Sequence, residues 1–101
     1  MLNMFKNLFG GGNGEAMKQL VADGAVIIDV RTPGEFAGGH PKGAVNIPLD
    51  KLDANLNKIK AYKKPIIVCC ASGMRSSSAK SQLTRKGIEN VHDAGSWSNL
   101  R

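Results

Sequence analysis

The segment from residue 65 to residue 86 restricts the fold more than any other part of the chain. Residues 65–70 are apolar without interruption, which predicts a strand covered on both faces. A short loop with a glycine and an arginine follows, and residues 76–86 have the pattern of a helix. A buried strand that passes through a tight loop into a helix is typical of an α/β domain with a parallel sheet.

The remaining segments alternate in the same way. A second aliphatic run at residues 25–30 also predicts a buried strand, and shorter strands are expected at residues 44–47 and 89–92. Helical spacing of apolar side chains predicts helices at residues 15–22 and 49–60. Because strands and helices alternate, the sequence predicts an α/β fold with a largely parallel sheet.

Several helix ends are marked by residues with known terminal preferences. The sequence Thr32-Pro33-Gly34-Glu35 is a capping-box pattern with proline at the first helical position, so a short helix should begin there. Gly24 and Gly87 each follow a helical segment, where glycine commonly occupies the position after the last helical residue.

A glycine-rich break at residues 10–14 separates the first nine residues from the rest of the chain. The 101 residues are enough for one domain and too few for two. We therefore expect an N-terminal segment at residues 1–14 and one domain at residues 15–101. Residues 1–9 are expected to dock on this domain as a helix or strand, and an anchor for a membrane or a partner is the alternative.

Hydropathy and charge restrict the partners and the location of the protein. No apolar run approaches the ~20 residues of a membrane span, and the start is too polar for a signal-peptide core. A cytoplasmic protein without membrane association is therefore expected. Because no extended apolar stripe stands out in the sequence, we also expect a monomer. The formal net charge is +6, but the basic residues are spread out apart from a cluster at Lys58, Lys60, Lys63 and Lys64. We expect this cluster to be a solvated face and not a nucleic-acid site.

The only two cysteines, Cys69 and Cys70, are adjacent, which argues against the common roles of cysteine pairs. Neighbouring Cα atoms lie ~3.8 Å apart, closer than the ~4.4–6.8 Å of most disulfides. The cysteines and the two histidines, His40 and His92, also lack metal-ligand spacing, so neither a metal nor an organic cofactor is expected. The pair therefore points to thiol chemistry.

Cys70 is placed where a thiol ionises readily. It ends a strand, and ligands of parallel sheets bind beyond the carboxyl ends of the strands. The N–H groups and the positive dipole end of the following helix would stabilise its thiolate. Gly73 permits a tight loop, and Arg75 supplies a positive fork for an anion or a neighbouring carboxylate. Cys69 should point to the opposite face of the strand and pack in the core.

Four segments of the chain are informative as an ordered set. They are Ile28-Asp29-Val30-Arg31-Thr32-Pro33-Gly34-Glu35-Phe36, then Gly39-His40 with Gly43-Ala44-Val45-Asn46-Ile47-Pro48-Leu49, then Cys70-Ala71-Ser72-Gly73-Met74-Arg75-Ser76, and finally residues 87–97. In this order they resemble the signatures of the single-domain rhodanese family of sulfurtransferases. The chain departs from the family pattern at Pro41-Lys42, at Gly95-Ser96 and in its glycine-rich start, departures that concern the edge of the sheet more than the loop.

The resemblance implies a three-layer α/β/α domain with a mostly parallel sheet of about five strands. It also implies that Cys70 is the catalytic residue, which accepts the outer sulfur of thiosulfate or a similar small anionic donor. Cyanide, a thiol or a sulfur-acceptor protein would then remove that sulfur. The residues expected to bind the substrate are Ala71, Ser72, Gly73, Met74, Arg75 and Ser76. The residues expected to support the loops are Asp29 and Arg31, as an ion pair, and His40, through a hydrogen bond.

Three alternatives stay open on the sequence alone. Counted from Cys69, the loop has the Cys-x5-Arg-Ser spacing of tyrosine phosphatases, for which Asp29 or Asp93 would be the general acid. A second alternative is a carrier that holds a persulfide and delivers it to a partner protein. The third is a redox sensor made of the two neighbouring thiols. Loss of thiosulfate:cyanide activity in Cys70→Ser, with activity kept in Cys69→Ser, would favour Cys70 over Cys69 as the nucleophile.

Overall fold

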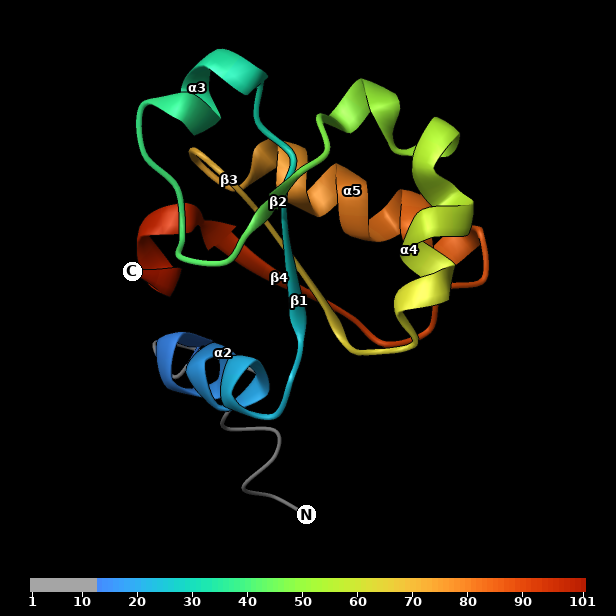
Figure 1. Ribbon diagram of the computed structural model, residues 1–101, viewed down its shortest axis with the longest axis horizontal. Helices are drawn as coiled ribbons and strands as arrows, with labels where there is room; N and C mark the ends of the chain where they lie inside the picture. Colours follow the sequence, from blue (N-terminus) through green and yellow to red (C-terminus); the bar gives the residue numbers. More distant parts are fainter. Residues whose placement is uncertain (1–12) are drawn as a thin grey trace.

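The computed structural model describes residues 13–101 (Figure 1). Residues 1–9, which were expected to dock on the domain, lie outside the described residues, as do residues 10–12 of the glycine-rich break. The first described helix, α2, spans Asn13–Ala22 and ends before Gly24, which has a φ of 103°. Asn13 and Gly14, expected to belong to the break, are therefore part of this helix.

The sheet has four parallel strands in the described part of the chain, where about five were expected. They are β1 (Val26–Asp29), β2 (Val45–Asn46), β3 (Ile66–Cys70) and β4 (Val91–Ser96), and their order in space is β2-β1-β3-β4. The strongest aliphatic run, β3, is buried along its whole length and lies between β1 and β4. This arrangement confirms the predicted α/β fold with a parallel sheet.

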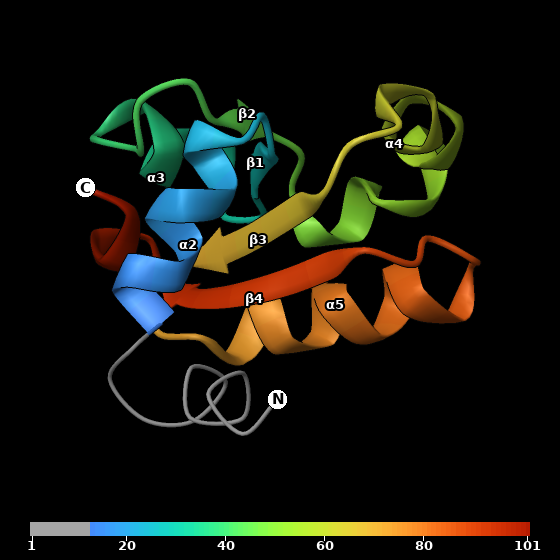
Figure 2. The same ribbon diagram turned by 90° about the horizontal axis from the view of Figure 1, so that it is seen from below.

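Helices cover both faces of the sheet and make a three-layer domain (Figure 2). On one face, α4 (Leu56–Tyr62) and α5 (Met74–Arg85) pack on a core that contains Ile28, Val68 and Cys70. On the other face, α2 and the C-terminal 3-10 helix Trp97–Leu100 pack on a smaller core. Its buried members are Met17, Ile27, Ile67, Cys69 and Ala94.

The segment predicted as one helix at residues 49–60 is divided into three short pieces. Two 3-10 helices, Leu49–Lys51 and Asp53–Asn55, precede α4. The side-chain amide of Asn55 donates to the carbonyl oxygen of Lys51 at 2.9 Å, the oxygen that would accept the Asn55 backbone N–H in an α-helix. Asparagine often competes with the helical backbone in this way, and the competition delays the start of α4.

The strand β4 starts later and runs further than the predicted segment 89–92. Its pairing with β3 contains a bulge, because Val68 pairs with Asp93 and Cys69 with Gly95, which leaves Ala94 as the extra residue. The Asp93 carboxylate accepts the backbone N–H of Gly95 at 2.8 Å and stabilises the irregular turn of the backbone. Bulges are frequent beside functional sites, and this one lies next to the end of β3.

The short helix α3 (Pro33–Ala37) begins as predicted. The Thr32 side chain accepts the backbone N–H of Glu35, and the Glu35 carboxylate accepts the backbone N–H of Thr32, which completes the capping box. None of the described helices has the length and apolar character needed to cross a bilayer.

Candidate active site

Cys70 and the loop that follows it form a small cradle at the carboxyl end of β3. Gly73 has a φ of 104°, a conformation that only glycine adopts readily, and α5 begins directly after it. The helix thus starts two residues before the predicted position at Ser76. The backbone N–H of Gly73, in the loop, and that of Ser76, in the first turn of α5, both donate to Cys70 Sγ, at 2.9 and 3.4 Å.

The cradle favours the ionised form of the Cys70 thiol. Burial opposes ionisation, since Cys70 has no solvent-exposed surface. The hydrogen bonds from the Ser76 side chain and from the backbone of Ser76, Gly73 and Ser72 outweigh that penalty and lower the pKa of Cys70. The Ser76 hydroxyl also reaches the carbonyl oxygen of Gly73 at 3.1 Å, so it ties the loop to the first turn of α5.

We expect the hydrogen bonds to Sγ to make the Cys70 thiol titrate at a lower pH than an ordinary cysteine, that is, with a lowered pKa. Thiolate absorbance at 240 nm, followed from pH 5 to 11, should show a step at this lower pH in the wild type. The same step should be missing in Cys70→Ser. A Cys70 step above pH 9 would show that burial outweighs the hydrogen bonds.

Cys69 has a different environment from its neighbour. It is fully buried in the core between the sheet and α2, on the opposite face from Cys70. Burial, followed by the nearby Asp29 carboxylate, raises the pKa of Cys69 to about 12. The raised pKa and the position on the face of the sheet opposite to Cys70 argue against the phosphatase register, which requires Cys69 to be a thiolate that faces the loop.

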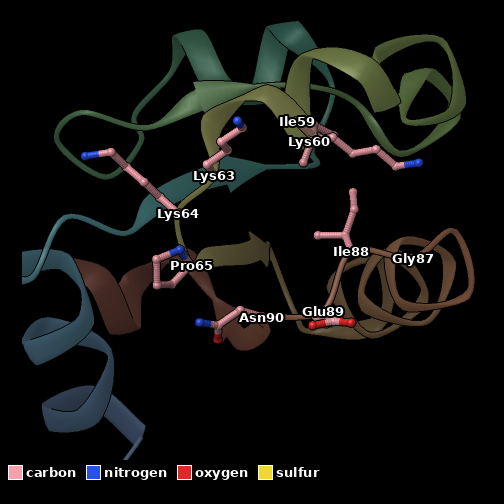
Figure 3. A pocket seen from close by; sticks show the side chains of 9 residues that line it. All are labelled: Ile59, Lys60, Lys63, Lys64, Pro65, Gly87, Ile88, Glu89 and Asn90. Carbon is pink, nitrogen blue, oxygen red and sulfur yellow. The ribbon is translucent and has the colours of Figure 1, made fainter.

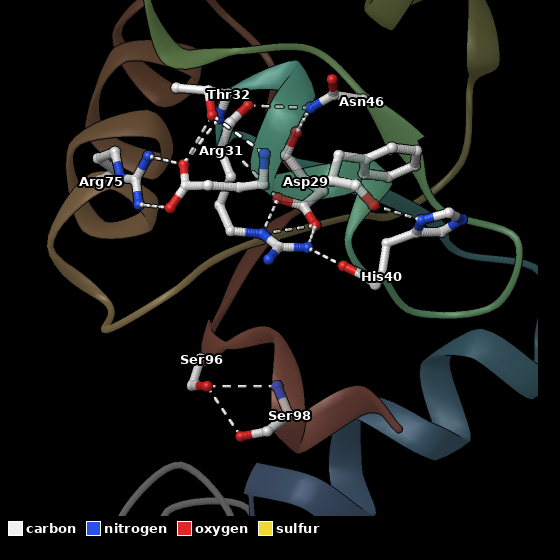
Figure 4. A network of polar contacts seen from close by, with 11 residues as sticks. Asp29, Arg31, Thr32, His40, Asn46, Arg75, Ser96 and Ser98 are labelled. Carbon is white, nitrogen blue, oxygen red and sulfur yellow. Dashed lines mark hydrogen bonds and ion pairs between the residues drawn. The ribbon is translucent and has the colours of Figure 1, made fainter.

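Arg75 is paired with a carboxylate that the sequence analysis used only as a helix cap. Its Nη1 and Nη2 donate to Oε1 and Oε2 of Glu35 at 2.7 and 3.0 Å (Figure 4). The hydrogen bond from Arg75, together with that from the Thr32 backbone, lowers the pKa of Glu35 to about 2. Arg75 thus contacts a neighbouring carboxylate, one of the two partners expected for it, and its role toward an anionic substrate stays a prediction.

Asp29 and Arg31 form a buried ion pair behind the loops. The Arg31 guanidinium donates to Asp29 Oδ2 from Nη2 at 2.6 Å and from Nε at 3.0 Å, and Nη2 also donates to the Gly39 carbonyl at 2.6 Å. Arg31 lies over the ring of Trp97, 4.7 Å from its centroid. The pair thus joins the end of β1 to the loop before β2 and to the C-terminal 3-10 helix.

Asn46 and His40 complete the support of these loops (Figure 4). The Asn46 side chain donates to the carbonyl oxygens of Asp29 and Arg31, at 3.0 Å each. His40 Nδ1 lies 2.8 Å from the Phe36 carbonyl oxygen, and its ring stacks on Phe36. Asn46 was not singled out from the sequence, although it lies within the second rhodanese-like segment.

The other predicted binding residues differ in their exposure. Ala71 and Ser72 are exposed, Met74 is 81% exposed, and Ser76 is buried beneath the loop. A cavity of about 500 Å³ lies beside the loop, and Arg75 is part of its wall. No group of three or more potential metal-ligating side chains occurs within residues 13–101.

A second cavity, of about 410 Å³, lies at the opposite end of the sheet, where Pro65 leads into β3 (Figure 3). Lys60, Lys63 and Lys64 line it, but the side chains of Lys60 and Lys64 extend in opposite directions. The ammonium groups therefore do not converge on a common point, and the cavity is separate from the Cys70 cradle.

Comparison with known proteins places this geometry in a family. The family model described as the rhodanese-like domain matches residues 13–99. The chain belongs to the rhodanese-like domain family. This membership confirms the resemblance of the four ordered segments, and the match covers nearly all of the described structure.

The chain is also similar to individual proteins of known sequence or structure. An uncharacterized protein of Bacillus subtilis, YqhL, is 41% identical over 69 residues, which cover 68% of this chain and 54% of that protein. A putative mitochondrial thiosulfate sulfurtransferase of Schizosaccharomyces pombe is 35% identical, covering 71% of this chain and 60% of that protein. The structure of the human single-domain sulfurtransferase TSTD1 aligns with a TM-score of 0.72 and 28% identity, covering 84% and 88% of the two chains. The chain thus spans between half and two thirds of the length of these two curated relatives.

Proposed function

We propose that this rhodanese-like domain is a sulfurtransferase that carries sulfane sulfur on Cys70. The Cys70 thiolate attacks the outer sulfur of a small anionic donor such as thiosulfate. The sulfur–sulfur bond of the donor breaks, its electron pair leaves on sulfite, and Cys70 becomes a persulfide. Cyanide or a thiol then attacks the outer persulfide sulfur and regenerates the Cys70 thiolate.

The observation that carries this proposal is the pair of backbone N–H groups directed at Cys70 Sγ. They stabilise negative charge on the sulfur before the reaction and are already in place when charge returns to it in the second step. The hydrogen bonds that lower the pKa of Cys70 favour the thiolate, which is the form that attacks the donor. The name of the Schizosaccharomyces pombe relative supports the same reaction class.

The direct test is the intact mass of the reduced protein after incubation with thiosulfate. We expect a gain of one sulfur, ~32 Da, that peptide mapping places on Cys70. Cyanide should remove this mass with release of thiocyanate. Repeated turnover would support an enzyme, whereas a single stoichiometric transfer would support a persulfide carrier.

The control is the same incubation with Cys70→Ser, which should gain no mass. A folded, reduced wild-type protein that gains no sulfur would contradict thiosulfate as the donor. Sulfur found on Cys69 would contradict the assignment of Cys70. An oxidised form lighter by two hydrogens, lost in either cysteine variant, would instead support the redox-sensor alternative.

A further inference from the structure

The positive charge of Arg75 is already neutralised in this structure. The guanidinium makes a two-pronged pair with Glu35, at 2.7 and 3.0 Å, and both side chains are about one third exposed, at 34% and 37%. Glu35 is itself held by the Thr32 backbone N–H at 3.0 Å and the Thr32 hydroxyl at 3.1 Å. The carboxylate is thus fixed by the start of α3, and the fork that would bind an anion is occupied.

The surroundings of Arg75 are acidic in a basic protein. The cavity beside the loop is lined by Arg75 together with Asp50 and Asp53. Three of the eight acidic residues of a chain with net charge +6 therefore either contact Arg75, as Glu35 does, or line the cavity that Arg75 borders. A donor that approaches Arg75 therefore meets a guanidinium whose positive charge the Glu35 carboxylate already offsets, although the chain as a whole is basic.

We propose that Glu35 sets the sulfur-donor preference of Cys70 by neutralising Arg75. The site then disfavours dianionic donors such as thiosulfate relative to persulfides carried on an uncharged organic group. Glu35 acts through Arg75 and is a positioning residue, not a catalytic one. This inference rests on the proposed sulfur transfer, and it adds the class of donor that the loop selects.

The two donor classes differ in the charge of the group that leaves. In both reactions the Cys70 thiolate attacks the outer sulfur, and the donor's sulfur–sulfur bond breaks. Thiosulfate releases sulfite, which takes the electron pair and carries two negative charges. An organic persulfide releases a thiolate with one negative charge. An unpaired guanidinium would stabilise sulfite more strongly, whereas the Glu35 carboxylate beside it opposes the second charge.

Glu35→Gln is the variant that tests this inference. Glutamine keeps the capping box with Thr32, so the helix start should be preserved while the negative charge is removed. The kcat/KM values for thiosulfate and for 2-hydroxyethyl persulfide are compared in the full chain. We expect the thiosulfate-to-persulfide ratio to rise about fivefold, mainly through a lower KM for thiosulfate. The rise should shrink as ionic strength increases.

The matched control is Glu89→Gln. Glu89 is exposed and lies at the far cavity, at the amino end of the sheet, so this variant removes one negative charge away from the loop. Its donor ratio should equal that of the wild type. A folded Glu35→Gln protein whose ratio is unchanged or lower would overturn the inference, as would an equal rise in Glu89→Gln.

A binding measurement separates this inference from the proposed function. Thiosulfate is titrated calorimetrically into Cys70→Ser and into the same variant with Glu35→Gln, neither of which can form a persulfide on residue 70. We expect about fivefold tighter thiosulfate binding when the Glu35 charge is absent. If the wild type accepts sulfur from neither donor, the proposed function fails, while unchanged thiosulfate affinity would still reject the role of Glu35.

Discussion

Cys70→Ser is expected to lower thiosulfate:cyanide turnover by at least about a thousandfold. A serine hydroxyl is not ionised at neutral pH, so the hydrogen bonds from Gly73 and Ser76 have no thiolate to stabilise. The protein should keep its fold because the substitution changes one atom. Steady-state release of thiocyanate measures the loss, and circular dichroism checks the fold.

Cys69→Ala is the matched control for this experiment. Its thiol lies in the opposite core and has a pKa of about 12, so it supplies no nucleophile at neutral pH. Turnover should stay within a few-fold of the wild type, with some loss of stability from the missing sulfur atom. Activity that depends on Cys69 and survives in Cys70→Ser would instead support the phosphatase-like register.

Asp29→Asn is expected to reduce the free energy of unfolding by about 3–5 kcal/mol. The side chains of Asp29 and Arg31 are 0% and 5% exposed, so the variant leaves a guanidinium in the interior without its carboxylate. The same loss loosens the link from β1 to Gly39 and Trp97. Urea unfolding followed by circular dichroism measures the change, which should appear as a lower midpoint.

A double-mutant cycle with Arg31→Met distinguishes a broken buried pair from a general packing defect. Removing both charges should cost less than the sum of the two single variants, because neither partner is then left buried alone. Strictly additive losses, or a loss below about 1 kcal/mol for Asp29→Asn, would contradict the buried-pair explanation.

The elements predicted best from sequence are those whose own residues determine their conformation. The aliphatic run of β3 is apolar on both faces, so it is stable only in the middle of the sheet, where both faces are covered. The capping box at Thr32 needs only hydrogen bonds to Glu35, three residues along the chain. The last strand was predicted too short because Asp93, Gly95 and Ser96 are poor strand formers. They are extended because they pair with the end of β3 across a bulge, a tertiary contact that local preference does not contain.

The predicted helix at residues 49–60 also shows that a local sequence pattern does not determine the exact backbone path. The apolar spacing from Leu49 to Ile59 fits one helix, yet the Asn55 side chain takes the Lys51 carbonyl oxygen and divides the segment. Leu52, which lies between the two short turns, is still completely buried and packs in the core with Ile28 and Val68. Periodicity indicates which side chains face the core, whereas the hydrogen bonds decide the exact path of the backbone.

By itself the sequence determined the order of strands and helices along the chain and the family. It also placed Cys69 and Cys70 on opposite faces of one strand, because side chains alternate along a strand. The tertiary structure alone decided which charges meet. Glu35 and Arg75 are forty residues apart and meet because α3 follows β1 and α5 follows β3, two neighbouring parallel strands that end on the same side of the sheet. The loop turn at Gly73 and the first turn of α5 likewise direct two N–H groups at one sulfur. The distances between these groups depend on how segments distant in the sequence pack together. Because the energy of interaction between charges depends on their distance, the charge balance of the site could not be predicted from the sequence.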